Sequence, residues 1–184
     1  MQNTLDQNIP DTRPADARPV DAEHLTTLVG ASQISHRVEE IARDVVADFS
    51  TNLTLVVILK NGLVFAADLL RALGRAGARV ELAYACPNGP QMVAPGLGDL
   101  TGRDVLVVDA ILDTGRTALQ TMDLARQAGA ADVRLAVLLD RPSRQSLGPI
   151  ADYTGFILPD RWVVGFGVDR DGAFRERSDV AALD

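Results

Sequence analysis

The sequence predicts an α/β fold: a mostly parallel central sheet flanked by helices, with a small carboxyl-terminal hood. Three observations support it. Four short aliphatic runs are rich in β-branched residues, two amphipathic stretches between them end at glycines, and the regular alternation stops after Asp140. Strands that alternate with helices pair in parallel, because each helix carries the chain back to the same edge. With 184 residues, 47% of them hydrophobic, the chain can close one core.

The first part of the chain is expected to be a tail followed by a helix. Residues 1–22 hold three prolines and little apolar periodicity, which predicts a flexible tail before a single domain over 23–184. From Ser32, which is placed to cap the first turn, apolar residues recur at helical spacing. The residues that set this spacing are Ile34, Val38, Ile41, Val45 and Phe49. This helix would cover one face of the sheet.

The sheet itself is expected from four nearly continuous apolar runs, which are typical of strands buried on both faces. These runs cover residues 53–59, 79–85, 104–111 and 133–139. A helical pattern that ends at Gly74 separates the first two runs, and another that ends near Gly129 follows the third. Farther along, residues 152–158 and 161–168 are strand-like pieces of an irregular hood, which we expect over about 141–184.

Composition narrows the classes of function. The net charge of −7 argues against a broad basic surface for nucleic acid, so a phosphate ligand would have to be captured locally. Cys86 is the only cysteine, which excludes an intrachain disulfide, and no early stretch joins basic residues to a long apolar run. We therefore expect a cytoplasmic protein that binds neither nucleic acid nor a membrane.

The densest group of polar residues follows the third aliphatic run, in the stretch DVLVVDAILDTGRTALQ. Ligands of parallel α/β sheets bind at the carboxyl ends of strands, where Asp109, Asp113 and Thr114–Thr117 would lie. Amides of a glycine turn at a helix amino terminus bind anions, and the two threonine hydroxyls add donors. Helix capping by Asp113 or Thr114 explains the turn but not Asp109. A carboxylate at the tip of a buried strand needs a cation or donors, which Mg²⁺ and a polyhydroxyl ligand would supply.

Two other phosphate-binding motifs do not match this stretch. A phosphatase of the haloacid dehalogenase type needs a second aspartate two residues after Asp109, where this chain has Ile111. The Walker sequence GxxxxGK[ST] does not occur. Neither class therefore accounts for the two aspartates and the glycine turn.

Lys60 is the only lysine among eighteen basic residues. It stands where an apolar run ends, just before Asn61 and Gly62. A compact ammonium group can enter a narrow site that a planar guanidinium cannot, which favours a functional role. Chance in a chain with arginine-rich codon usage is the alternative explanation.

Four stretches resemble a known family. VVDAILDTGRTAL resembles the thirteen-residue phosphoribosyl pyrophosphate signature of type I phosphoribosyltransferases. ILKNGLVFAADLL, LLDRP and GFILPDRWVVGFGVDRDGAFR resemble the pyrophosphate loop, the purine-loop entry and the hood of hypoxanthine-guanine phosphoribosyltransferases, so the likeness extends from about Ser32 onward. It implies the type I phosphoribosyltransferase fold and transfer of a phosphoribosyl group to hypoxanthine or guanine, with Mg²⁺ as cofactor. Relatives are commonly dimers or tetramers, so a homo-oligomer is implied as well.

The resemblance also implies roles for individual residues. Asp113 is implied as the catalytic proton acceptor at purine N7, and Asp109 as the residue that binds the ribose hydroxyls. The phosphate-binding set is Asp109, Asp113, Thr114, Gly115, Arg116 and Thr117. The pyrophosphate-binding set is Leu59, Lys60, Asn61, Gly62 and Arg175, with a Leu59–Lys60 peptide that can be cis. The purine-binding set is Arg141, Trp162, Val163 and Asp169, and the implied metal ligands are Asp109 and Asp169.

The chain departs from the family pattern at four places. Ala110 stands where a second acid is usual, Arg141 replaces a lysine, and Asn61 replaces a glycine or similar small residue. The expected lid, ACPNGPQMVAPGLGDLTGR, lacks the usual Ser-Tyr pair. These departures keep two alternatives open: a nucleotide-binding regulator with little turnover, and a transferase for another base.

Overall fold

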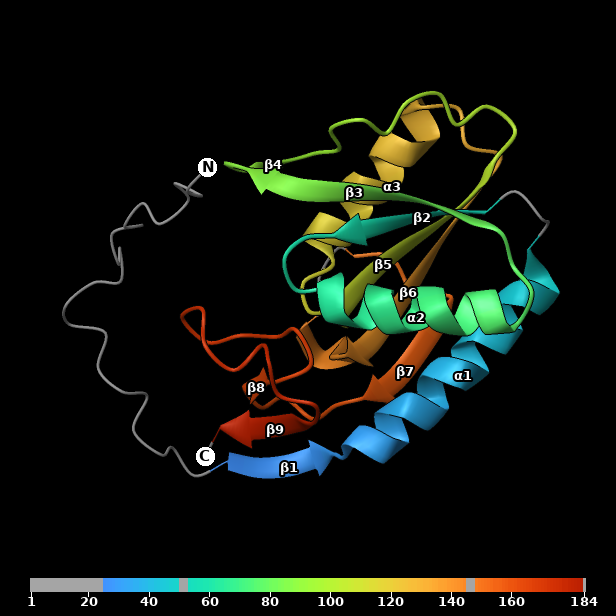
Figure 1. The fold of residues 1–184 in the computed structure, drawn as a ribbon. Helices are drawn as coiled ribbons and strands as arrows, with labels where there is room; N and C mark the ends of the chain where they lie inside the picture. Colours follow the sequence, from blue (N-terminus) through green and yellow to red (C-terminus); the bar gives the residue numbers. More distant parts are fainter. Residues whose placement is uncertain (1–24, 50–52, 145–147, 184) are drawn as a thin grey trace, which may run out of the picture.

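The computed structural model describes residues 25–49, 53–144 and 148–183 (Figure 1). The tail predicted over residues 1–22 lies outside the described residues. None of the described helices combines the length and hydropathy needed to cross a bilayer.

The main sheet has six strands in the order β4-β3-β2-β5-β6-β7. All neighbouring pairs are parallel except β3 and β4, which confirms the predicted mostly parallel α/β fold. The strands are β2 (Leu53–Ile58), β3 (Val80–Asn88), β4 (Gln91–Val93), β5 (Asp104–Leu112), β6 (Asp132–Asp140) and β7 (Tyr153–Ile157). The runs predicted from apolar residues correspond to β2, β3, β5 and β6, with β3 extended by three residues at its carboxyl end.

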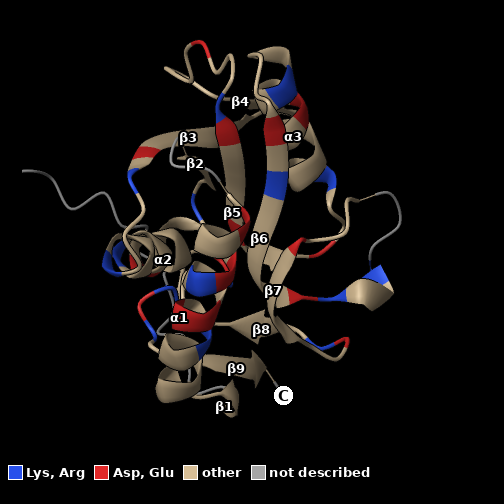
Figure 2. Ribbon diagram, turned by 90° about the vertical axis from the view of Figure 1, so that its right-hand side faces the viewer, with Lys and Arg blue, Asp and Glu red and all other residues tan. Residues whose placement is uncertain are grey.

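Helices cover both faces of this sheet. Figure 2 shows α1 (Ala31–Asp48) and α2 (Leu63–Arg75) on one side and α3 (Arg116–Gln127) on the other. On the first side, residues such as Phe65 and Leu69 pack against strand residues that include Leu106. On the second side, α3 packs against the alternate strand residues, which include Val107 and Val137. The helical patterns that separate the strands therefore form the two layers expected of this fold.

A second, smaller sheet forms the hood. It contains β1 (Leu25–Val29), β9 (Val180–Leu183) and β8 (Val163–Val164), all antiparallel, and lies beyond β7 in Figure 1. Strand β1 was not expected from the sequence, and β7 joins the main sheet although its residues were assigned to the hood. The hood therefore combines the first described strand with the last part of the chain.

Two local predictions were wrong. Strand β3 is not buried on both faces, because Leu82 and Tyr84 are 62% and 43% exposed. Only the three-residue β4 lies beyond this strand, and α2 packs mainly over β5 and β2, so β3 is left partly uncovered. Ser32 does not cap α1 either, since the N-cap is Gly30, whose amide donates a 2.9 Å hydrogen bond to Gln33 Oε1. Ser32 lies inside the first turn instead.

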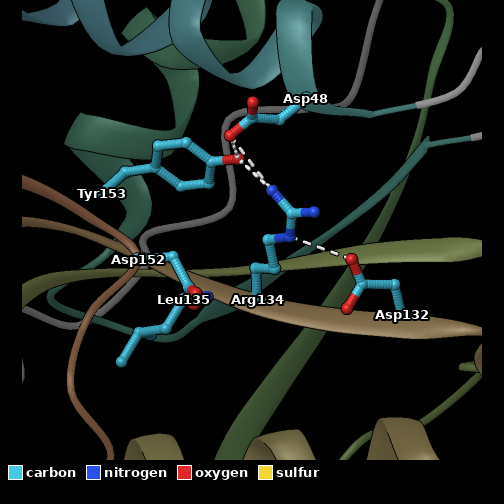
Figure 3. Close-up of polar contacts among 6 residues, drawn as sticks. All are labelled: Asp48, Asp132, Arg134, Leu135, Asp152 and Tyr153. Carbon is cyan, nitrogen blue, oxygen red and sulfur yellow. Dashed lines mark hydrogen bonds and ion pairs between the residues drawn. The ribbon is translucent and has the colours of Figure 1, made fainter.

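A polar cluster joins the end of α1 to the start of β6 (Figure 3). The Nη1 atom of Arg134 lies 3.1 Å from Asp48 Oδ2 and donates a 3.0 Å hydrogen bond to the Tyr153 hydroxyl. That hydroxyl donates to Asp48 Oδ2 at 2.9 Å, and Arg134 Nε donates to Asp132 Oδ2 at 2.9 Å. Burial, together with the hydrogen bond to Asp48, raises the pKa of Tyr153 to about 12. The guanidinium also lies 4.6 Å from the centre of the Phe49 ring.

Arg134→Met is expected to lower the free energy of unfolding by ~1–2 kcal/mol, because it removes hydrogen bonds to partly exposed carboxylates and a cation–π contact. Urea unfolding followed by circular dichroism measures the loss. Arg126→Met is the control, since Arg126 forms an exposed pair with Asp123 that contributes at most a few tenths of a kcal/mol. Equal losses in the two variants would contradict a stabilising role for this cluster.

Candidate functional site

Part of the predicted pyrophosphate-binding and phosphate-binding sets meets where β2 and β5 end, whereas the predicted purine-binding residues Arg141, Trp162, Val163 and Asp169 do not line the cavity there. These strands are parallel neighbours, so the loop after β2 and the turn after β5 leave the sheet at the same edge. A cavity of about 570 Å³ opens there. It is lined by Ile58, Leu59, Lys60, Asn61, Cys86, Pro87, Asp109, Thr117 and Arg175. The structure thus brings residues of the pyrophosphate-binding set and the phosphate-binding set to one cavity.

The loop after β2 is packed tightly against β5. Its Leu59–Lys60 peptide is cis, as the family resemblance implied. Gly62 has no space for a side chain, because a Cβ there would lie 2.7 Å from the Ile58 carbonyl oxygen and 2.9 Å from that of Val108. The same Cβ would lie 3.2 Å from the Cα of Asp109. The glycine therefore allows the lysine loop to lie directly beside Asp109.

Asp109 is a buried carboxyl group at the cavity wall, with 6% of its surface exposed. Its Oδ1 accepts a 2.7 Å hydrogen bond from the Ala110 amide. Burial raises its pKa to about 7, although the amides of Ala110 and Ile111 act in the opposite direction. Among the described residues, no three His, Cys, Asp or Glu side chains form a group that could hold a metal. A hard cation at Asp109 would therefore take most of its ligands from water and bound substrate.

Asp109→Asn is expected to change how stability depends on pH. The folded-state pKa of about 7 exceeds the ordinary value of 3.8, so the stability that Asp109 contributes is complete below 3.8 and is lost as pH rises toward 7. Across this pH range, the free energy of unfolding of the variant should rise relative to that of the wild type, by at most about 1.4 kcal/mol per pH unit. Thermal unfolding of both proteins at several pH values, without divalent cations, measures the difference. A difference that does not vary with pH would contradict the raised pKa.

The turn after β5 leads into the amino terminus of α3, where the Arg116 amide donates a long 3.5 Å hydrogen bond to Thr114 Oγ1. Gly115 has a φ of 77° and forms the N-cap of α3, a left-handed conformation that favours glycine. The first helical hydrogen bond runs from the Leu119 amide to the Gly115 carbonyl at 2.9 Å. The amides of Arg116, Thr117 and Ala118 precede this bond and have no carbonyl partner within the helix. No acidic residue lies in the first turn, so no carboxylate of that turn would compete with a phosphate group for these amides.

Asp113 and Arg141 form an ion pair, with Arg141 Nη2 2.9 Å from Asp113 Oδ2. The guanidinium also donates from Nη1 to the Arg161 carbonyl at 2.9 Å. Arg141 is only 5% exposed, so it is not an ordinary surface residue. Through these contacts, Arg141 links the turn after β5 to the hood. Trp162, which follows Arg161, is 54% exposed and is therefore not part of the hood core. Val163, the next residue, is buried in β8.

Arg175 joins the hood to the loop after β2. Its Nη1 donates to Asn61 Oδ1 and to the Gly167 carbonyl, both at 2.6 Å. Its Nη2 lies 2.7 Å from Asp169 Oδ1, while Asp169 Oδ2 accepts a 2.8 Å hydrogen bond from the Gly172 amide. The structure therefore groups Asp169 with Arg175 and Asn61, two residues of the pyrophosphate-binding set.

Several residues near the site were not among the predicted site residues, although Cys86 and Pro87 lie in the stretch that was expected to form the lid. Cys86 and Pro87 line the cavity because β3 lies beside β2, with the Leu59 amide bonded to the Ala85 carbonyl at 2.8 Å. The expected lid begins with a hairpin in which the end of β3 pairs with β4. Gly148 was also missed, and its Cα lies 2.3 Å from the place that a Cβ on Gly115 would take. Cys86 and Pro87 could be placed at the cavity only from the strand order, which the sequence does not show.

Comparisons with known proteins agree with this geometry. A family model described as "Phosphoribosyl transferase domain" matches residues 26–171. The hypoxanthine-guanine phosphoribosyltransferase of Homo sapiens is 34% identical over 167 residues, which cover 82% of this chain and 77% of that protein. The bifunctional protein TilS/HprT of Listeria innocua is 32% identical over 85% of this chain, which spans only 25% of that relative's length.

Among solved structures, the hypoxanthine phosphoribosyltransferase of Trypanosoma cruzi in complex with the product IMP is 27% identical. It superposes with a TM-score of 0.80 over 90% of this chain and 93% of that one. The sheet order, the cavity at the ends of β2 and β5, and the family match over most of the chain lead to one assignment. This chain belongs to the phosphoribosyl transferase domain family.

Proposed function

We propose that this chain transfers the phosphoribosyl group of phosphoribosyl pyrophosphate to hypoxanthine or guanine, which yields a nucleoside monophosphate and pyrophosphate. The observation that carries the proposal is that Lys60, Asp109, Thr117 and Arg175 line the same cavity. Cations for pyrophosphate, a carboxylate for the ribose hydroxyls and a helix amino terminus for the 5′-phosphate are the groups this substrate needs. The human relative's name and the IMP bound to the T. cruzi neighbour support the same reaction.

The residues suit the charges that develop during such a transfer. Positive charge builds on the ribose carbon as negative charge collects on the departing pyrophosphate. Lys60 and Arg175 would stabilise the pyrophosphate, while the Arg116 and Thr117 amides hold the 5′-phosphate in place. Asp113 would accept the proton from purine N7. Lys60 lies in the loop after β2, Asp113 lies in the turn between β5 and α3, and Arg175 lies in the hood, so three separate segments supply these groups.

The residues present fit Mg²⁺ as the proposed cofactor. Asp109 would offer hard oxygen ligands, and burial raises its pKa although the Ala110 and Ile111 amides act in the opposite direction. Asp169 is the second proposed ligand, although Arg175 and the Gly172 amide contact its two oxygens in this structure. A bound Mg²⁺ would supply charge neutralisation for the pyrophosphate.

The proposed base site favours 6-oxopurines. Arg141 carries only hydrogen-bond donors and Asp113 carries acceptors, so together they match the O6 and N7–H edge of hypoxanthine or guanine. Adenine presents an amino group in place of O6, which would face a guanidinium with no acceptor. Arginine can take the place of the family's lysine here, because a guanidinium also donates to purine O6 and N7 when proteins read guanine. Trp162 is exposed and would stack on the base.

A substrate panel tests the proposal. The purified chain is incubated with phosphoribosyl pyrophosphate, Mg²⁺ and one base at a time: hypoxanthine, guanine, xanthine or adenine. Chromatography of the nucleotides should show product with hypoxanthine or guanine and none with adenine. The same reaction after metal chelation, followed by Mg²⁺ titration, tests the cofactor. Product with adenine alone would favour a transferase for another base.

The second candidate function is a nucleotide-binding regulator with little turnover. Ala110 is fully buried where the family usually has an acid, so one ribose contact is missing. Asp113 is already paired with Arg141, which a substrate must share or displace. Nucleotide binding measured by calorimetry, without consumption of any base, would support this candidate and reject the transferase.

We also propose that the protein acts in the cytoplasm as a homo-oligomer, a dimer or a tetramer. Large apolar side chains are exposed on α2 and β3, at Leu63, Leu82 and Tyr84, and exposed apolar side chains of this kind are often covered at protein interfaces. Light scattering of the purified chain measures the assembly, and a monomer at micromolar concentration would reject it.

A further inference from the structure

Asn61 stands where the resembled enzymes carry a glycine or similar small residue, and its side chain makes a contact that glycine cannot make. Its Oδ1 accepts a 2.6 Å hydrogen bond from Nη1 of Arg175. The two residues are 114 positions apart in the chain, and both line the cavity. This hydrogen bond therefore joins the loop after β2 to the hood at the cavity wall.

The backbones of these two segments are also in contact. A Cβ on Gly167 would lie 2.3 Å from the Asn61 carbonyl oxygen, so this hood turn approaches the loop as closely as glycine permits. The Gly167 amide donates to the Arg175 carbonyl at 3.0 Å, and its own carbonyl accepts from Arg175 Nη1. Arg175 is thus held by its own turn on one side and by Asn61 on the other.

Asp169 completes the set of acceptors around this guanidinium, at 2.7 Å from Nη2. Of the three contacts, the one with Asn61 alone comes from outside the hood. Asn61 directly follows Lys60, so the same loop carries one cation and orients another. Side chains that are fixed before binding lose less conformational entropy when a ligand arrives.

We infer that Asn61 is a positioning residue for the pyrophosphate group: it holds Arg175 at the cavity wall so that Arg175 and Lys60 act on the same anion. The inference rests on the proposed function for the identity of the anion. Binding of pyrophosphate does not require turnover, so it can be measured whether or not a base is consumed.

Asn61→Ala is expected to weaken the binding of pyrophosphate with Mg²⁺ by about tenfold, the effect of losing one hydrogen bond to a charged group. Isothermal titration calorimetry on the full chain measures it. Ribose 5-phosphate, which would bind the turn at α3, should keep its affinity and thereby show that the site is folded. Asn61→Gly, which restores the family's small residue, should match Asn61→Ala.

A double-mutant cycle separates positioning from direct contact. In the Arg175→Met background, Asn61→Ala should cause no further loss of pyrophosphate affinity. Arg126→Met is the charge-matched control, on the exposed carboxyl-terminal part of α3, and should leave pyrophosphate binding unchanged. Additive losses in the cycle, or full affinity in Asn61→Ala alone, would overturn the inference.

The outcomes also separate this inference from the proposed function. If the wild type binds pyrophosphate but consumes no base, the transferase function is rejected. The double-mutant cycle then still tests the role of Asn61, because it measures only pyrophosphate affinity. A wild type that does not bind pyrophosphate at all overturns both.

Discussion

Asp113→Asn is expected to lower kcat for phosphoribosyl transfer to the purine by ~10²–10⁴, the range typical of losing a general base. Asparagine keeps the size of the side chain and an oxygen for the 2.9 Å contact with Arg141, but it cannot take the proton from N7. The affinity for phosphoribosyl pyrophosphate should stay largely unchanged, because the α3 turn, Lys60 and Arg175 are intact. Steady-state kinetics with hypoxanthine or guanine gives kcat and KM separately.

Asp123→Asn is the control for the charge change, since Asp123 is a half-exposed residue of α3 that pairs with Arg126. It should leave kcat close to that of the wild type. Thermal unfolding of both variants shows whether loss of the Arg141 contact has also destabilised the fold. A kcat for Asp113→Asn that equals the wild-type value would exclude Asp113 as the base.

The central sheet could be predicted because β2, β5 and β6 carry nearly continuous apolar runs, which few other structures accommodate. Strand β1 could not, since its partner β9 lies at the other end of the chain and its five residues show no clear pattern alone. The exposure of Leu82 and Tyr84 depends on where β3 stands in the sheet, which the order of the strands along the chain does not reveal.

Site residues could be predicted mainly where they directly follow a strand. The register between β5 and β6 accounts for one further contact once the sheet is known. Leu112 on β5 is paired with Asp140 on β6, so Asp113 and Arg141 each follow a paired residue, and their ion pair is a consequence. The bond between Asn61 and Arg175 has no such local cause, because it depends on how the hood turns back over the cavity. Such long-range contacts of loops are the part that periodicity and motifs do not encode.

Gly148→Ala is expected to weaken ribose 5-phosphate binding by ~10²-fold, because it displaces the turn proposed to hold the 5′-phosphate. A Cβ on Gly148 would lie 2.6 Å from the Gly115 Cα and 3.0 Å from the Thr114 carbonyl oxygen. Both are backbone atoms, so neither can rotate away, and the turn itself must shift. The nearest neighbours of such a Cβ belong to Gly115 and Thr114 and not to the lysine loop, so pyrophosphate affinity should change much less. This pattern is the reverse of the one expected for Asn61→Ala.

Gly74→Ala is the matched control for Gly148→Ala, since a Cβ at Gly74 meets no atom within 4 Å. Gly74 lies in α2, where alanine is the better helix former, so this variant should be as stable as the wild type or more stable by up to ~1 kcal/mol. Calorimetry with ribose 5-phosphate and with pyrophosphate, on both variants, gives the comparison. If Gly148→Ala loses affinity for ribose 5-phosphate and for pyrophosphate to the same degree, the fold as a whole has been damaged. If its affinity for ribose 5-phosphate is unchanged, the close approach of Gly148 does not position the turn.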